Sequence, residues 1–148
     1  MPGYAGAPTP GEERDLPEIP PCTILYVEDN PANLRLVEGI LEHFPGVTML
    51  SAMQGGLGVE LAIEHVPDLV LLDINLPDIS GLTVLHRLLR HPRTAGIPVV
   101  VLSADATRER VQQLLDSGAR AYLTKPLEVG EFLRTVANTV RHSQPVSS

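Results

Sequence analysis

The sequence predicts an α/β protein in which helices cover both faces of one parallel β-sheet. Short apolar runs alternate with helical patterns five times along the chain. Residues 69–72 form one such run and are entirely aliphatic, which is typical of a strand that is buried on both faces. Short loops join the runs and favour right-handed βαβ units. We therefore predict a doubly wound (βα)5 domain with strand order 2-1-3-4-5.

Each predicted strand is a short apolar run that turn residues bound. Pro67 and Asp68 turn the chain into the third run. Pro98 can lie only at the beginning of the fourth strand, because proline donates no hydrogen bond to a sheet. In chain order, the predicted strands are residues 22–27, 47–52, 69–72, 97–102 and 121–124.

Each predicted helix has a helical repeat of apolar residues or a recognisable start or stop signal. Leu34 and Val37 fall on one face of the first helix, and Asn30 before Pro31 is a good N-cap followed by a proline suited to the first turn. Gly118 ends the fourth helix. In chain order, the predicted helices are residues 31–44, 57–65, 81–89, 107–117 and 128–141.

The length and charge limit the classes of protein that the chain could belong to. Its 148 residues correspond to about one domain, which can bury a full core without metal or disulfide cross-links. The net charge of −7 argues against nucleic-acid binding, which requires a basic surface. The single cysteine, Cys22, begins an apolar run and is expected to be a buried thiol in a reducing compartment.

The two ends of the chain are predicted to be disordered, as a leader or linker (residues 1–21) and a short tail (residues 142–148). The first segment contains six prolines and three glycines, a composition that buries little apolar surface. Residues 22–141 form the predicted domain. The chain has no signal-peptide pattern and no apolar run of about 20 residues, so we expect a soluble cytoplasmic protein without membrane association.

Polar residues follow four of the predicted strands at the points where the strands end. Glu28 and Asp29 follow the first, Asp73 the third, Ser103 the fourth, and Lys125, the only lysine, the fifth. These side chains are expected to converge, because ligands bind at the carboxyl edge of an open α/β sheet. An aspartate can serve as a nucleophile, the other acids can hold Mg2+, and the lysine can pair with a phosphoryl oxygen. The set predicts a phosphate site.

Each of these residues also has a simpler structural interpretation. Glu28 and Asp29 could be a helix-capping acid pair near the positive end of the first helix, Ser103 could be the N-cap of the fourth helix, and Lys125 could be a solvated loop charge. Tyr122 could be a core residue. The joint placement of acids, hydroxyl and lysine at the ends of four strands favours the functional interpretation of the set.

Residues 22–141 resemble the receiver domain of response regulators, which is the phosphoacceptor half of bacterial two-component signalling and has a flavodoxin-like fold. The resemblance implies that Asp73 is the phosphorylated aspartate. Glu28 and Asp29 match the acidic pair of the family, and Asn75 matches the position whose backbone carbonyl completes the Mg2+ coordination.

The resemblance also assigns three residues to the response to phosphorylation. Ser103 matches the hydroxyl residue that follows the phosphoryl group, and Tyr122 matches the switch aromatic. Lys125 and Pro126 match the lysine of the family and its proline, which usually follows a cis peptide bond. The implied cofactor is Mg2+, and the implied partners are a histidine kinase or phosphotransfer protein and an unknown downstream protein. The chain would be a signalling module, not an enzyme, although it would catalyse its own phosphorylation and dephosphorylation.

Two departures from the family pattern bear on function. Many members have Asp where this chain has Glu28, which keeps the charge and lengthens the side chain, so Mg2+ binding is expected to survive. Receivers of one large class of DNA-binding regulators carry two acids before the switch aromatic and use them in a charged dimer face. This chain has Arg120 and Ala121 there, so that dimer is not expected.

Other functions fit the sequence less well than a receiver does. A haloacid-dehalogenase-like phosphatase also uses a strand-end aspartate and Mg2+, but its second acid protonates the leaving group, and Asn75 at that place cannot. A flavin module is disfavoured because an acidic edge repels the flavin phosphate. The glycines of residues 55–58 lack the third glycine of a dinucleotide fingerprint and are interpreted as a turn. Both a free-standing receiver and a receiver from a hybrid histidine kinase fit the sequence.

Overall fold

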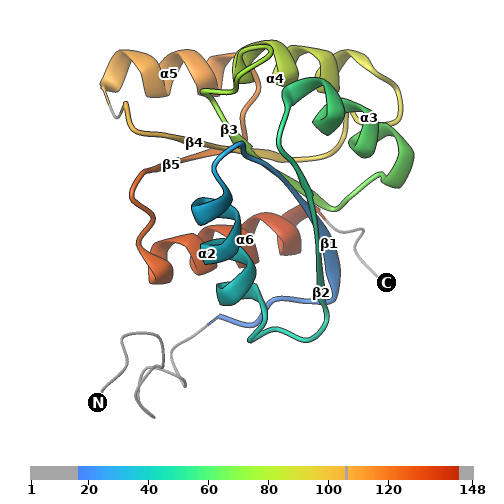
Figure 1. The fold of residues 1–148 in the computed structure, drawn as a ribbon, viewed down its shortest axis with the longest axis vertical. Coiled ribbons are helices and arrows are strands. Elements are labelled where there is room, and N and C mark those ends of the chain that lie inside the picture. Colours follow the sequence, from blue (N-terminus) through green and yellow to red (C-terminus); the bar gives the residue numbers. More distant parts are fainter. Residues whose placement is uncertain (1–16, 106, 144–148) are drawn as a thin grey trace.

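The computed structural model describes residues 17–105 and 107–143, and within them the predicted fold class and strand order are confirmed. The parallel sheet has the order β2-β1-β3-β4-β5. Helices α3, α4 and α5 cover one face of the sheet, while α2 and α6 cover the other (Figure 1). The strands are β1 (Cys22–Val27), β2 (Val47–Ala52), β3 (Leu69–Asp73), β4 (Val99–Ser103) and β5 (Ala121–Thr124). The helices are α2 (Pro31–Leu41), α3 (Gly55–His65), α4 (Gly81–Arg90), α5 (Arg108–Asp116) and α6 (Val129–Ser143).

Several element boundaries differ from the prediction, and those of β4 and α2 differ for identifiable reasons. Strand β4 begins at Val99 instead of residue 97, since Pro98 has no N–H and offers only its carbonyl, which accepts a hydrogen bond from Val70 N at 3.0 Å. Helix α2 ends at Leu41, three residues early. Its apolar repeat continues, but the following turn is tightened by a bond from Phe44 N to the carbonyl of Leu41, so the segment leaves the α-helical pattern.

The glycine segment after β2 is not the turn that the sequence predicted, because it forms the beginning of α3. A Cβ atom at Gly55 would lie 2.6 Å from Ile79 Cγ1, and one at Gly58 would lie 2.7 Å from Val27 Cγ2. These glycines therefore allow α3 to pack closely against β1 and against the loop that follows β3.

The core consists of two apolar clusters, one on each face of the sheet. Ile24 and Tyr26 of β1 belong to the cluster that α2 and α6 cover, whereas Leu25 and Val27 belong to the cluster that α3, α4 and α5 cover. Residues 69–72 are all fully buried, as the continuous apolar run predicted. The central strands are therefore fixed from both sides, which makes the carboxyl edge of the sheet a rigid support for a site.

The described parts of the two termini pack differently from a simple linker. Ile19 packs against the cluster under α2 and α6, and α6 continues to Ser143. The remainder of the predicted leader and tail lies outside the described residues. Cys22 is buried, as expected. Among the described helices, none combines the length and the apolar character that crossing a membrane requires.

Candidate functional site

The strand register brings the predicted polar residues to one edge of the sheet. Val27, the last residue of β1, pairs with Leu72, the residue before Asp73. At the other side of the site, Asp73 pairs with Leu102, and Ser103 pairs with Thr124. Residues that lie up to 97 positions apart in sequence therefore meet at this edge, as the carboxyl ends of parallel strands require.

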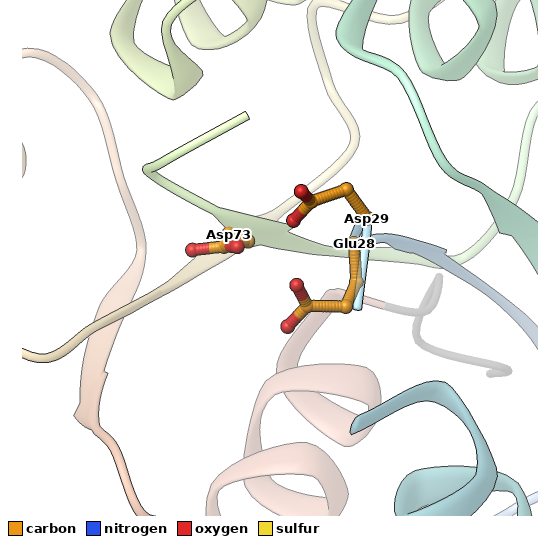
Figure 2. A group of neighbouring side chains, drawn as sticks. All are labelled: Glu28, Asp29 and Asp73. Atoms are coloured by element: carbon orange, nitrogen blue, oxygen red, sulfur yellow. The ribbon is translucent and has the colours of Figure 1, made fainter. Parts of the chain in front are cut away.

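Three carboxylates form the centre of the site. Glu28, Asp29 and Asp73 each offer one oxygen, and these oxygens lie within 4.8 Å of one another. Figure 2 shows the side chains of Glu28 and Asp29 extending from the end of β1 toward the side on which Asp73 lies. Glu28 is 0 % exposed and Asp73 is 3 % exposed, whereas Asp29 is less buried. An all-oxygen, negatively charged donor set of this kind fits a divalent cation such as Mg2+.

Lys125 connects two of these carboxylates. Its Nζ atom lies 2.8 Å from Glu28 Oε1 and 3.3 Å from Asp73 Oδ2. The backbone holds the lysine in place as well, because its N–H donates to the carbonyl of Ser103 at 3.0 Å. The peptide bond between Lys125 and Pro126 is cis, as the family resemblance implied.

The ionisable groups of the site shift one another's pKa values. Burial would raise the pKa of Glu28, but hydrogen bonds with Asp73, Lys125 and Tyr26 and the charge of Lys125 lower it to about 2. Burial and the hydrogen bond with Glu28 raise the pKa of Asp73 to about 6. Burial would lower the pKa of Lys125, but its contacts with both acids raise it. Of the two buried acids, Glu28 is therefore the one that holds its negative charge more firmly.

The loop after Asp73 is fixed at two points. Asp73 Oδ1 accepts a hydrogen bond from Asn75 N at 3.1 Å. Further along the loop, the carboxylate of Asp78 accepts hydrogen bonds from Gly55 N at 2.7 Å and Gly56 N at 2.9 Å, and so it anchors the loop to the beginning of α3. Asp78 was not among the residues predicted from the sequence. The two glycines that begin α3 are a possible signal for such an acid, but the hydrogen bonds between them and Asp78 form only through tertiary contact.

The simpler interpretations of the acidic pair and of Ser103 as helix caps do not hold. Asn30 caps α2 by accepting a hydrogen bond from Ala32 N at 2.8 Å, as predicted. Thr107 caps α5, while the buried Ser103 hydroxyl accepts a hydrogen bond from Asp105 N at 3.1 Å. Ser103 is therefore available to the site at the edge of the sheet.

Tyr122 lies beside β4, opposite Val101 in the strand register, and packs against the cluster that α3, α4 and α5 cover. Its hydroxyl is buried without a hydrogen-bond partner and is the one side-chain nitrogen or oxygen atom in the described part of the chain for which this holds. A buried polar atom without a partner is costly. The ring thus packs as a core residue does, but its hydroxyl is unsatisfied in this conformation.

Two further residues contact the acidic cluster and were not predicted as site residues. The Tyr26 hydroxyl donates to Glu28 Oε1 at 2.9 Å, and Asn33 Nδ2 donates to the same oxygen at 3.1 Å. Tyr26 had the pattern of a strand core residue and Asn33 that of a polar helix residue. No local motif distinguishes them, and the contact of Asn33 with Glu28 arises only when α2 packs against β1.

Comparison with known proteins identifies the family of the chain. Residues 24–137 match the family model of the response regulator receiver domain. The chain belongs to this family. The resemblance that the sequence suggested is thereby confirmed, and it supports the receiver interpretation over the phosphatase alternative.

Three similar proteins illustrate the range of the family. The chain is 42 % identical over 123 residues to the DNA-binding dual master transcriptional regulator RpaA of a Synechocystis species, covering 83 % of this chain and 51 % of that protein. This chain thus spans about half the length of that relative. The polar-differentiation response regulator DivK of Brucella anthropi is 34 % identical over 116 residues, covering 78 % of this chain and 94 % of DivK.

The third is a solved structure, the receiver domain of a sensor histidine kinase from Pseudomonas aeruginosa with a magnesium ion coordinated in its active-site cleft. It matches with a TM-score of 0.74 and 27 % identity, covering 81 % of this chain and 98 % of that one.

Proposed function

We propose that Asp73 is the phosphoacceptor of this receiver and takes a phosphoryl group from a histidine kinase or phosphotransfer protein. The observation that carries the proposal is the arrangement around Asp73. Its carboxylate lies within 4.8 Å of those of Glu28 and Asp29, and its Oδ2 atom lies 3.3 Å from Lys125 Nζ. The edge where α/β sheets bind ligands thus holds a nucleophile, a set of oxygen ligands and the ammonium group of Lys125.

The contacts of Asp73 suggest how the transfer proceeds. A carboxylate oxygen of Asp73 attacks phosphorus and forms a new P–O bond, while the P–N bond to the donor imidazole breaks and nitrogen retains the electron pair. The Asn75 N–H holds Oδ1, so the carboxylate is oriented before it reacts. Lys125 lies beside Oδ2 and can pair with the incoming phosphoryl oxygens as a point charge.

We further propose that the metal is Mg2+ and that Glu28, Asp29, Asp73 and the backbone carbonyl of Asn75 hold it. When bound, the ion supplies positive charge that offsets the negative charge of donor and acceptor. Mg2+ prefers one or two carboxylates together with water and phosphate oxygens, and the three carboxylates fit this preference. The magnesium ion in the related receiver of the Pseudomonas aeruginosa kinase supports the same choice.

The receiver is proposed to pass its signal on by binding a protein partner. Ser103 and Tyr122 are the proposed switch residues, because Ser103 ends β4 and Tyr122 lies in the adjacent β5. We expect the Ser103 hydroxyl to move toward the phosphoryl group and the unsatisfied Tyr122 hydroxyl to change its surroundings. The protein is expected to act in the cytoplasm, on a protein target and not on nucleic acid.

The proposal is tested by phosphorylation in vitro. Incubation with acetyl phosphate and Mg2+ is expected to add one phosphate, detected by intact-protein mass spectrometry, that alkali and hydroxylamine remove as they do from any acyl phosphate. Asp73→Asn is expected to abolish the labelling, whereas the control Asp116→Asn on the outer helix α5 is expected to leave it unchanged. Equal labelling of the Asp73→Asn variant would refute the assignment.

A further inference from the structure

The two oxygens of the Glu28 carboxylate have very different surroundings. Oε1 accepts three hydrogen bonds, from the Tyr26 hydroxyl at 2.9 Å, from Asn33 Nδ2 at 3.1 Å and from Lys125 Nζ at 2.8 Å. Oε2 accepts one long bond, from Asn30 N at 3.3 Å. Because Glu28 is 0 % exposed, these protein groups and not bulk water determine how its carboxylate is oriented.

The number of donors on Oε1 limits what that oxygen can bind. A carboxylate oxygen offers about two lone-pair sites, and three donors occupy them fully. A cation can therefore approach Glu28 only through Oε2. The same three bonds fix the plane of the carboxylate, since each donor comes from a different element: Tyr26 from β1, Asn33 from α2 and Lys125 from the end of β5.

The position of Tyr26 explains how the donors meet. Tyr26 and Glu28 are two residues apart, and successive side chains of a strand alternate between its faces, so both lie toward α2. Asn33 lies in the first turn of α2, three residues after the Asn30 cap. A buried tyrosine hydroxyl does not always find a hydrogen-bond partner in this fold, because the hydroxyl of Tyr122 is also buried and has none.

We propose that Tyr26 and Asn33 are positioning residues that divide the oxygens of Glu28 between two tasks. Oε1 anchors Lys125, and Oε2 faces the cation. This inference rests on the proposed function, because it concerns the residues that would hold the metal. Loss of either donor leaves the Glu28 carboxylate held by fewer hydrogen bonds and allows it to rotate, so that the cation and Lys125 compete for it.

The test is a set of Mg2+ titrations in which binding is measured by calorimetry. Tyr26→Phe keeps the buried ring and removes only the hydroxyl, and Asn33→Ala removes the amide. Each is expected to weaken Mg2+ binding about tenfold, at the lower end of the effect of removing a group that orients a metal ligand. Glu38→Ala, an exposed residue of the same helix, is the matched control and is expected to bind Mg2+ as the parent protein does.

A double-mutant cycle distinguishes positioning from a general structural effect. In a Glu28→Gln background the ligand that Tyr26 orients is changed, so Tyr26→Phe is expected to have no further effect on Mg2+ affinity. A loss that came from a disturbed core would persist in that background. Lys125 provides a second measurement, since it is the only lysine of the chain and gives a single side-chain ammonium signal in 15N NMR. This signal is expected to shift in metal-free Tyr26→Phe and not in metal-free Glu38→Ala.

The outcomes separate this inference from the proposed function. If the parent protein binds no Mg2+, the proposed function fails and the inference fails with it. If the parent protein binds Mg2+ but Tyr26→Phe and Asn33→Ala bind it equally well, the inference alone is refuted. A tenfold loss that remains in the Glu28→Gln background also refutes it, because the hydroxyl would then act on something other than Glu28.

Discussion

Removing one charge from the acidic cluster is expected to stabilise the metal-free protein and to weaken its metal binding. Asp29→Asn preserves the size of the side chain and removes a carboxylate that lies within 4.8 Å of two others. At that separation each pair of charges repels by about 0.9 kcal/mol in water and by about 3.5 kcal/mol at an effective dielectric constant of about 20. Lys125 offsets part of this repulsion, and Asp29 is the least buried of the three acids. We therefore expect a net gain of about 1 kcal/mol.

Mg2+ is expected to reverse the order of stability. A ligand that binds only the folded state stabilises it by about 2.7 kcal/mol when its concentration is about a hundred times its Kd. The parent protein should gain this amount, whereas Asp29→Asn should gain much less because it has lost a ligand. The variant is thus expected to be more stable than the parent in EDTA and less stable in saturating Mg2+.

Urea unfolding, monitored by far-ultraviolet circular dichroism, measures the stability of each protein in EDTA and in Mg2+. Glu38→Gln makes the same change in net charge at an exposed position on α2 and is expected to alter stability by less than about 0.5 kcal/mol in either buffer. The reasoning is refuted if Asp29→Asn is less stable than the parent in EDTA, or if it gains as much stability from Mg2+ as the parent does.

Three further predictions follow from the same site. In metal-free protein, the free energy of unfolding is expected to fall as the pH rises from about 4 to about 6, because folding raises the pKa of Asp73 from 3.8 to about 6. Asp73→Asn should remove this fall, as measured by urea unfolding across the same pH range. Lys125→Arg should fold normally but accept phosphate from acetyl phosphate more slowly, because it lacks the compact ammonium, and parent-like rates would show that charge alone suffices. Ser103→Ala should bind beryllofluoride with Mg2+ yet give a smaller NMR shift at Tyr122 than the parent, and an equal shift would exclude the hydroxyl as the coupling group.

The sequence predicted the strands and the convergence of their ends because these depend on short-range patterns and on one general rule of sheet topology. A continuous apolar run such as residues 69–72 must be covered on both faces, and parallel strands place their carboxyl ends at one edge. Given those two constraints, Asp73 and Lys125 were expected to approach one another although they lie far apart in the sequence.

The parts that could not be predicted depend on how separate elements pack. Asn33 is a site group only because the packing of α2 against β1 brings its amide to the same oxygen of Glu28 that the Tyr26 hydroxyl contacts. Asp78 anchors the loop after β3 only because glycines let α3 approach it closely. In each case the residue type was compatible with a simpler role, and the decisive information was a distance between elements that no local pattern contains.

The unequal contacts of Lys125 suggest which of them phosphorylation replaces. The bond to Glu28 Oε1 is 2.8 Å long and the contact with Asp73 Oδ2 is 3.3 Å long, so the lysine is held mainly by Glu28. If Asp73 accepts the phosphoryl group as proposed, that group offers several acceptor oxygens near the weaker contact, and we expect the lysine to turn toward it without releasing Glu28. Glu28 would then serve as the fixed support of the lysine in both states. A glutamate at this position reaches Lys125 through Oε1, while Oε2 accepts only the long bond from Asn30 N, and this gives a physical reason for a longer acid at residue 28.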